Sequence, residues 1–293
     1  MRKFVIAALA VAALMAVSGV AYAVNVYTVT GTTQPRGKGK PKKPLPVSLN
    51  FDYTVADENP DFRGTPVERY FIGAEGLVTY PELFPKCSGD SENANHPDKA
   101  TAKARCKKAR VGGGTVAAVG GAPTDQLDKN NCVLDLNLYN LKPGRYPVEG
   151  RPGEGTKFVK VSKKHGGLAI RLDGDQPAPP SLDPSEKGEC AVPQHAAIIA
   201  PYTPVRIGGV RSDELRFTVP YSLLHLGGLD VVVRQVRSSI KKLTARKRIA
   251  GKRRKVGFYS AIGCKGRTRL LQATFVDEAG RPTKKTEQPA RPC

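Results

Sequence analysis

The residues VSLNFDYTV (47–55) alternate strictly between apolar and polar side chains. Apolar residues stand at Val47, Leu49, Phe51, Tyr53 and Val55, so every second side chain is apolar. Successive side chains of a β-strand point to opposite faces of its sheet. This period of two therefore predicts a strand with one face in a core and the other in solvent.

Many other short segments of the chain have a period of two or are rich in β-branched residues. Clusters of Gly, Pro, Asp and Asn separate them, as at 139–155 and 172–189. The segment 100–110 contains helix-forming residues but lacks a wide apolar stripe, so we expect at most a short helical turn there. The pattern predicts an all-β, antiparallel, sandwich-like fold. The further predicted strands are 25–33, 67–80, 114–120, 132–141, 157–162, 167–174, 196–202, 214–223, 229–240, 256–264 and 269–280.

The first 23 residues have the pattern of a secretory signal peptide. Arg2 and Lys3 precede the apolar run 4–17, and the small-x-small sequence Ala21-Tyr22-Ala23 predicts cleavage after Ala23. The apolar run is short for a bilayer span, so a membrane anchor is the less favoured alternative. We therefore expect an exported, secreted protein that is not transmembrane.

The rest of the chain divides into two regions by composition. Residues 24–46 contain the first predicted strand and a basic linker rich in Pro and Gly, which cannot form a core. Residues 47–293 form the sandwich-like region. One domain or two sub-domains, with a boundary near 175–190, are both compatible with this length.

Six cysteines remain after the leader, and they predict a disulfide-bonded protein. An even number of cysteines in an exported chain indicates three disulfides. Several pairings are possible, and we favour Cys87–Cys106, Cys132–Cys190 and Cys264–Cys293. None of the cysteines has the close spacing of a zinc site or of a redox-active pair.

Several motifs resemble a class of exported β-rich proteins of high-GC actinobacteria for which no activity is established. The motifs are NVYTVTG (25–31), SLNFDY (48–53), FPKC (84–87), CKKARVGGGTV (106–116), LNLYN (136–140) and GFYSAIGCKG (257–266). The chain departs from the class at Lys107, where a proline usually follows the cysteine. The resemblance covers most of the mature chain, and it implies export and β-structure but no mechanism.

The sequence contains no pattern that indicates an enzyme. It lacks the nucleophile elbow of serine hydrolases, the zinc motif of metalloproteases and the phosphate loop of nucleotide-binding enzymes. The four histidines are scattered along the chain. An exported hydrolase would need a triad that forms only in space, for example His195 or His225 with Asp230 and a serine. We therefore expect no catalytic activity, no cofactor and no metal.

Positive charge is the strongest functional signal of the sequence. The formal net charge is +21, or +19 without the two basic residues of the leader, and the pI is about 9.9. The segment KKLTARKRIAGKRRK (241–255) has no acidic residue, and strand-like residues flank it, which predicts a β-hairpin with its turn near Ala250-Gly251. Smaller basic segments lie at 36–43 and 99–110. The predicted contact residues are Lys241, Lys242, Arg246, Lys247, Arg248, Lys252, Arg253, Arg254 and Lys255.

Two explanations of this hairpin remain open. It binds an anionic cell-wall polymer or an anionic lipid surface, or it is the solvated basic face of a structural or protein-interaction module. Lys and Arg at a sheet edge also discourage aggregation, which favours the second explanation. No aromatic residue lies within 241–255, so stacking on single-stranded nucleic acid is not expected. Sequence-specific recognition of nucleic acid is not expected either.

Overall fold

The alternating segment 47–55 forms the centre of strand β2 (Leu45–Asp57) in the computed structural model. Val47, Phe51, Tyr53 and Val55 are buried, as the period of two predicts. The structure describes residues 25–57, 64–121, 130–174, 197–226, 229–287 and 293.

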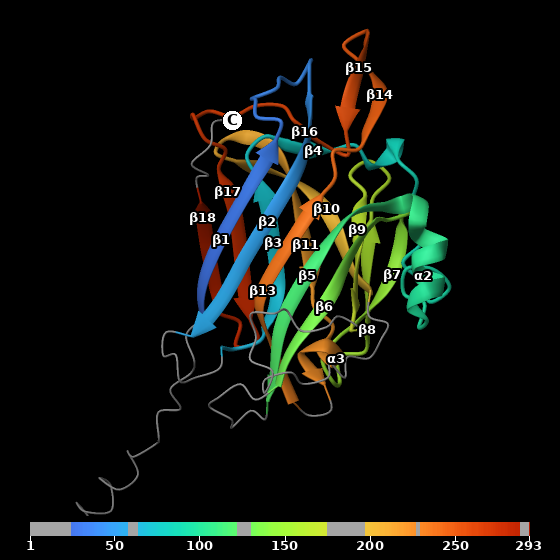
Figure 1. The fold of residues 1–293 in the computed structure, drawn as a ribbon, viewed down its shortest axis with the longest axis vertical. Helices are drawn as coiled ribbons and strands as arrows, with labels where there is room; N and C mark the ends of the chain where they lie inside the picture. The colour runs from blue at the N-terminus through green and yellow to red at the C-terminus, as the bar shows by residue number, and fades with distance from the viewer. Residues whose placement is uncertain (1–24, 58–63, 122–129, 175–196, 227–228, 288–292) are drawn as a thin grey trace, which may run out of the picture.

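Two antiparallel layers face each other and make the protein an all-β sandwich (Figure 1). The first layer has the strand order β1–β2–β13–β5–β6–β9–β10, and the second has the order β10–β11–β3–β17–β18. The strands of the first layer are β1 (Asn25–Gln34), β2, β13 (Leu229–Ile240), β5 (Arg110–Gly121), β6 (Asn130–Asn140), β9 (Gly167–Asp173) and β10 (Ala197–Ile207). Those of the second are β11 (Val210–Thr218), β3 (Val67–Ala74), β17 (Leu271–Asp277) and β18 (Pro282–Glu287).

Strand β10 belongs to both layers and joins them. Its first residues, from Ala197 to Pro201, pair with β9, and its later residues, from Tyr202 to Ile207, pair with β11. At one end of the sandwich, the short strand β16 (Tyr259–Ala261) pairs with the start of β2, and β4 (Leu77–Thr79) pairs with β16. The strand pairs of the described residues are all antiparallel. The helical turn α3 (Tyr221–Leu224) leads directly into β12 (His225–Leu226), which pairs with β13.

An aromatic cluster lies between the two layers. The Phe275 ring stacks on Tyr27 at 4.5 Å between centroids and meets the edge of Tyr70 at 5.6 Å. Tyr53 donates a hydrogen bond from its hydroxyl to that of Tyr70, at 3.2 Å, so both phenol groups are satisfied inside the core. Tyr27 and Tyr53 belong to the first layer, and Tyr70 and Phe275 to the second. These rings therefore hold the two layers together.

A second, smaller core covers the outer face of the first layer. Helix α2 (Lys99–Cys106) and the hairpin of β7 (Gly144–Glu149) and β8 (Thr156–Val161) pack over β6, β9 and β10. Arg171 of β9 points outward yet is completely buried beneath this cover. Its Nε donates to Asp173 at 2.7 Å and its Nη1 to the carbonyl of Ala94 at 3.1 Å, which offsets the cost of burying the charge.

Two of the predicted disulfides are present in the described residues. Cys87–Cys106 closes the segment before α2, and Cys264–Cys293 fixes the last residue to the connection between β16 and β17. The third predicted pair, Cys132–Cys190, includes Cys190, which lies outside the described residues. The confirmed pairs show that the protein is disulfide-bonded.

Several segments differ in detail from the sequence-based description. The residues around 100–106 form an eight-residue α-helix rather than a helical turn, and Asp98 caps its first turn through the backbone N–H of Thr101. The basic segment 35–44, described above as part of a linker, connects β1 to β2, which pair with each other. β9 and β10 also pair, so the same sheet continues on both sides of 174–196.

Replacement of Phe275 by alanine tests the aromatic cluster. We expect Phe275→Ala to lower the free energy of unfolding by about 3–5 kcal/mol, because the buried ring leaves a cavity between the layers. Phe158→Ala serves as the control, since this ring is 55% exposed. It should cost less than about 1 kcal/mol. Urea denaturation followed by circular dichroism measures both, and equal losses would contradict the role of the cluster.

Candidate functional site

The segment 241–255 forms the predicted hairpin, which projects from one end of the sandwich (Figure 1). Its strands are β14 (Thr244–Ile249) and β15 (Lys252–Gly257). The two turn residues, Ala250 and Gly251, both have positive φ, at 46° and 79°. This is the backbone of a two-residue turn that matches the right-handed twist of the strands.

The register of the hairpin places like charges directly opposite each other. Arg246 faces Lys255, Lys247 faces Arg254, and Arg248 faces Arg253. Like charges at directly opposed positions destabilise a pair of strands. The free hairpin thus carries a repulsion that nearby anions would relieve.

The two faces of the hairpin have different surroundings. Arg246, Arg248, Arg253 and Lys255 share one face, and all four are exposed. The other face carries Lys247 and Arg254, which are partly buried, and Lys252, which is exposed beside the turn. The exposed face is therefore the part of the hairpin that is open to a partner.

The inner face of the hairpin is fixed to the short 3-10 helix η1 (Pro81–Leu83). Lys247 Nζ lies 2.5 Å from Glu82 Oε1 and 4.6 Å from the centre of the Tyr80 ring. Burial raises the pKa of the Tyr80 hydroxyl, and Arg211 acts in the opposite direction. A cation, a ring and an acid thus hold the middle of β14 against η1.

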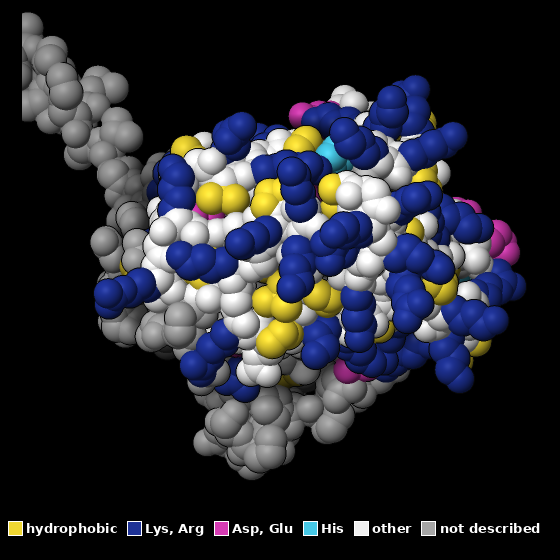
Figure 2. Space-filling model, turned by 90° about the horizontal axis from the view of Figure 1, so that it is seen from above, with side chains coloured by type: hydrophobic (Ala, Val, Ile, Leu, Met, Phe, Trp, Pro, Cys, Tyr) yellow, Lys and Arg dark blue, Asp and Glu magenta, His cyan; other side chains and the backbone are white. Residues whose placement is uncertain are grey.

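The sandwich end that carries the hairpin is basic over several connections. We call it the basic end and define it by residues 35–44, 162–166, 241–257 and 262–270. These segments contain 19 of the 47 Lys and Arg residues of the chain and no Asp or Glu. Figure 2 looks onto this end and shows Lys and Arg side chains spread across it, with some apolar side chains between them.

The fold brings two of the three basic segments of the sequence together at the basic end. Gly39, in the connection between β1 and β2, forms a β-bridge with Ile262, which closely follows β16. Its φ is +62°, and a Cβ at this position would lie 1.9 Å from the carbonyl oxygen of Ala261, so only glycine fits. The cations of the connection are exposed: Arg36, Lys38, Lys40, Lys42 and Lys43.

A buried ion network holds these connections in place. Glu75 is 3% exposed and accepts hydrogen bonds from the backbone N–H of Lys265 and of Leu270. Arg269 donates to the carbonyls of Glu75 and Gly37. Burial lowers the pKa of Arg269 to about 10, against the opposing effect of the Glu75 carboxylate. These hydrogen bonds therefore fix the backbone of the connections that carry the surface cations.

The third basic segment, 99–110, is partly neutralised. Lys99 and Lys103 both lie within 4 Å of Asp135, and Arg105 lies 3.1 Å from Glu92. These ion pairs leave less free positive charge on α2 than on the hairpin.

Of the nine predicted contact residues, seven are exposed and two, Lys247 and Arg254, are partly buried. The sequence analysis missed Lys163, Lys164, Lys265 and Arg267, which are also exposed at the basic end. They stand singly or in pairs in connections far apart along the chain. Only the strand pairing shows that these connections lie at the same end.

His225 does not have the geometry that a hydrolytic triad needs. His225 lies near Asp230, as the alternative requires, with Nδ1 at 2.9 Å from Oδ1. Its Nε2, however, lies 2.6 Å from the Glu278 carboxylate. Neither ring nitrogen is left to accept a proton from a serine hydroxyl. His195 lies outside the described residues.

A charge reversal within the hairpin tests the opposed cations. We expect Arg253→Glu to increase the protection of the hairpin amides against hydrogen exchange by up to roughly fivefold, because it faces Arg248. Arg253→Gln, which removes the charge without reversing it, should give a smaller increase. If both variants exchanged like the wild-type protein, the opposed cations would not be a source of strain.

Within the described residues, no helix is both long enough and apolar enough to cross a membrane. The same residues contain no group of three or more His, Cys, Asp or Glu side chains that could hold a metal ion. Comparisons with models of protein families, with curated proteins and with solved structures found no match. The function of the chain must therefore be inferred from its own surface and interior.

Proposed function

We propose that the protein is exported and binds a linear anionic polymer of the cell envelope at its basic end, without catalysing a reaction. The observation that carries this proposal is the set of opposed cations on β14 and β15. Natural strands usually avoid such pairs, since each one opposes hairpin formation. A bound polyanion would turn this repulsion into attraction and would release counterions from the polymer.

The shape of the hairpin favours a chain-like ligand. Successive side chains on one face of a strand lie about 6.8 Å apart, so the exposed face offers two parallel rows of cations. The connection 35–44 adds a second group of exposed cations at the same end. A flexible polymer with regularly spaced negative charges can contact both groups.

An anionic lipid surface is the less favoured partner. Proteins that bind membrane surfaces commonly insert large apolar side chains between the lipids. In the described part of the chain, the exposed large apolar residues are Val26, Phe158 and Leu229, and none of them belongs to the basic end. Attraction to lipid would therefore depend mainly on charge.

Two observations support the export part of the proposal. Disulfides persist mainly in oxidising compartments outside the cytoplasm, and two are present here. The first 23 residues have the pattern of a cleaved leader. An exported protein would meet anionic wall polymers outside the cytoplasm.

Salt-dependent binding to purified anionic wall polymer, and to heparin as a second polyanion, tests the proposal. The protein used is residues 24–293. The variant changes the exposed face of the hairpin, Arg246, Arg248, Arg253 and Lys255, to serine. Each lost contact should lower the slope of log K against log salt concentration by about 0.7–0.9, so we expect the slope to fall by about 3.

A control variant with the same loss of charge separates a site from general electrostatics. Arg69, Lys157, Arg237 and Lys284 are exposed cations of β3, β8, β13 and β18, outside the basic end. Changing these four to serine should leave the slope nearly unchanged. Equal effects of the two variants, or weak binding of the wild-type protein, would contradict a specific site. Tighter binding to anionic vesicles than to the polymer would point to lipid instead.

A further inference from the structure

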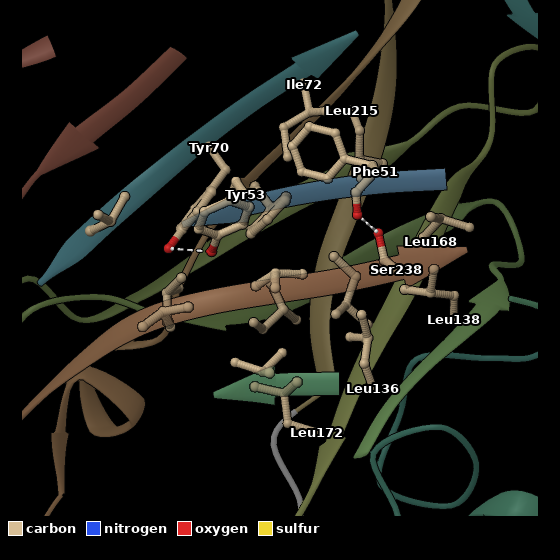
Figure 3. A pocket seen from close by; sticks show the side chains of 18 of the residues that line it. Phe51, Tyr53, Tyr70, Ile72, Leu136, Leu138, Leu168, Leu172, Leu215 and Ser238 are labelled. Carbon is tan, nitrogen blue, oxygen red and sulfur yellow. Dashed lines mark hydrogen bonds between the residues drawn. The ribbon is translucent and has the colours of Figure 1, made fainter. Parts of the chain in front are cut away.

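A cavity of about 150 Å³ lies between the two layers of the sandwich (Figure 3). Leu136, Leu138 and Leu172 approach it from the first layer, and Ile72 and Leu215 from the second. Leu172, Ile72 and Leu215 are only partly buried although they line this interior space. Protein interiors are usually close-packed, so a space of this size marks a place that a further molecule can fill.

The hydroxyl groups that border the cavity already have partners. Tyr53 donates a hydrogen bond to Tyr70 at 3.2 Å, and Tyr259 donates one to Tyr202 at 2.9 Å. Ser238 donates to a backbone carbonyl of β2, also at 2.9 Å (Figure 3). These groups therefore add little polarity to the lining, because their hydrogen bonds are made within the protein.

Asp213 also borders the cavity, but its carboxylate is occupied and covered. Its Oδ2 accepts hydrogen bonds from the backbone N–H and the hydroxyl of Thr79, at 2.7 and 2.9 Å. Its Oδ1 is buried and lies 3.6 Å from Nδ1 of His165. Among the described residues of the lining, no side chain thus presents an accessible polar group that lacks a partner. Burial of an unpaired polar group is costly, so the part of a ligand that enters must be hydrocarbon.

The cavity is longer than it is wide. On β13 of the first layer, lining residues recur from Val231 to Ile240, over nearly the whole strand. On β3 of the second layer, they recur from Val67 to Ala74, over the full length of that strand. A volume of about 150 Å³ that extends along whole strands is a narrow space. It suits one extended chain better than a branched ring.

The two ends of the cavity differ in exposure. At the end beside β4 and β16, Leu77 is 0% and Tyr259 is 5% exposed, so buried side chains close it. At the other end, where α3 lies, the lining residues Val219, Leu226 and Val231 are only partly buried. Solvent therefore reaches the end at α3, and a polar group placed there can remain in water.

We propose that the cavity binds one unbranched alkyl chain, which enters at α3 and keeps its polar head group in solvent. A space of about 150 Å³ holds about six carbon atoms. The apolar wall contacts the chain along its length, and the narrow shape excludes branched rings. An unbranched chain is the hydrocarbon part of fatty acids and of many lipids, so the ligand class is a single-chain amphiphile. This site lies inside the core and does not depend on polymer binding at the basic end.

Alcohols of different length and shape test the proposal. 1-Butanol, 1-hexanol, 1-octanol and menthol are titrated into residues 24–293, and the methyl NMR signals of Leu136 and Leu168 are followed. Each methylene added between 1-butanol and 1-hexanol should tighten binding about fourfold, since it buries more apolar area. Menthol is a branched ring alcohol that partitions between water and octanol about as 1-octanol does. It should bind about tenfold more weakly than 1-octanol, because only its shape differs in a way that matters here.

The head group is tested with octanoate, which has a charged carboxylate in place of the hydroxyl. We expect it to bind within about tenfold of 1-octanol, because a head group in solvent is not desolvated. Loss of binding would contradict the placement of the head group at α3. Equal binding of menthol and 1-octanol, or no saturable shift with any of the alcohols, would overturn the proposal.

Two cavity-filling variants and a matched control connect the binding to the cavity. Val236→Phe adds a ring to the lining on β13 and should weaken binding of 1-hexanol by about tenfold or more, with the thermal unfolding transition retained. Val26→Phe makes the same change at a position that is 40% exposed and does not line the cavity, so it should bind like the wild type. Leu215→Phe fills the cavity from the second layer and decides the matter if Val236→Phe fails to fold. Unchanged binding in the filling variants would place the ligand elsewhere and overturn the proposal.

Discussion

The burial of apolar strand faces between the two layers is the interaction on which the rest of the structure depends. Phe275 is completely buried there, and strand β10 makes the contact continuous by belonging to both layers. The stabilisation from hydrophobic burial grows with the apolar area removed from water, and it does not depend on which residues occupy the surface. The buried core can therefore stabilise the fold although the charges of the basic end repel each other.

Two features of the structure use this core in opposite ways. The basic end adds charge outside it, on connections that Glu75 and Arg269 hold in place. A cavity of about 150 Å³ between the two layers leaves the packing inside the core incomplete. Both reduce the stability that the same chain length could reach, and functional sites commonly depart from the best packing in this manner.

The sequence predicted the local features of the fold and the hairpin. Alternation in 47–55 identified β2, and the acid-free segment with Ala250-Gly251 identified the hairpin and its turn, because these signals lie within a few residues of each other. Pairing over long distances, such as that of Ile240 with Leu49, leaves no local signal. For this reason neither the grouping of Lys163 with the hairpin nor the approach of Asp213 to an apolar cavity could be predicted. The burial of Arg171 was also unpredictable, since its partners come from other segments.

The first and last strands of the chain have a consequence for how the protein folds. β1 begins at Asn25, directly after the predicted leader, and it contacts β17 and β18 at the far end of the sequence. This edge of the sandwich cannot form until β1, β17 and β18 are all present. A chain that crosses a membrane as an extended thread would therefore stay incompletely folded until its last strands emerge. In such a chain the Cys264–Cys293 disulfide would also form late, because Cys293 follows β18.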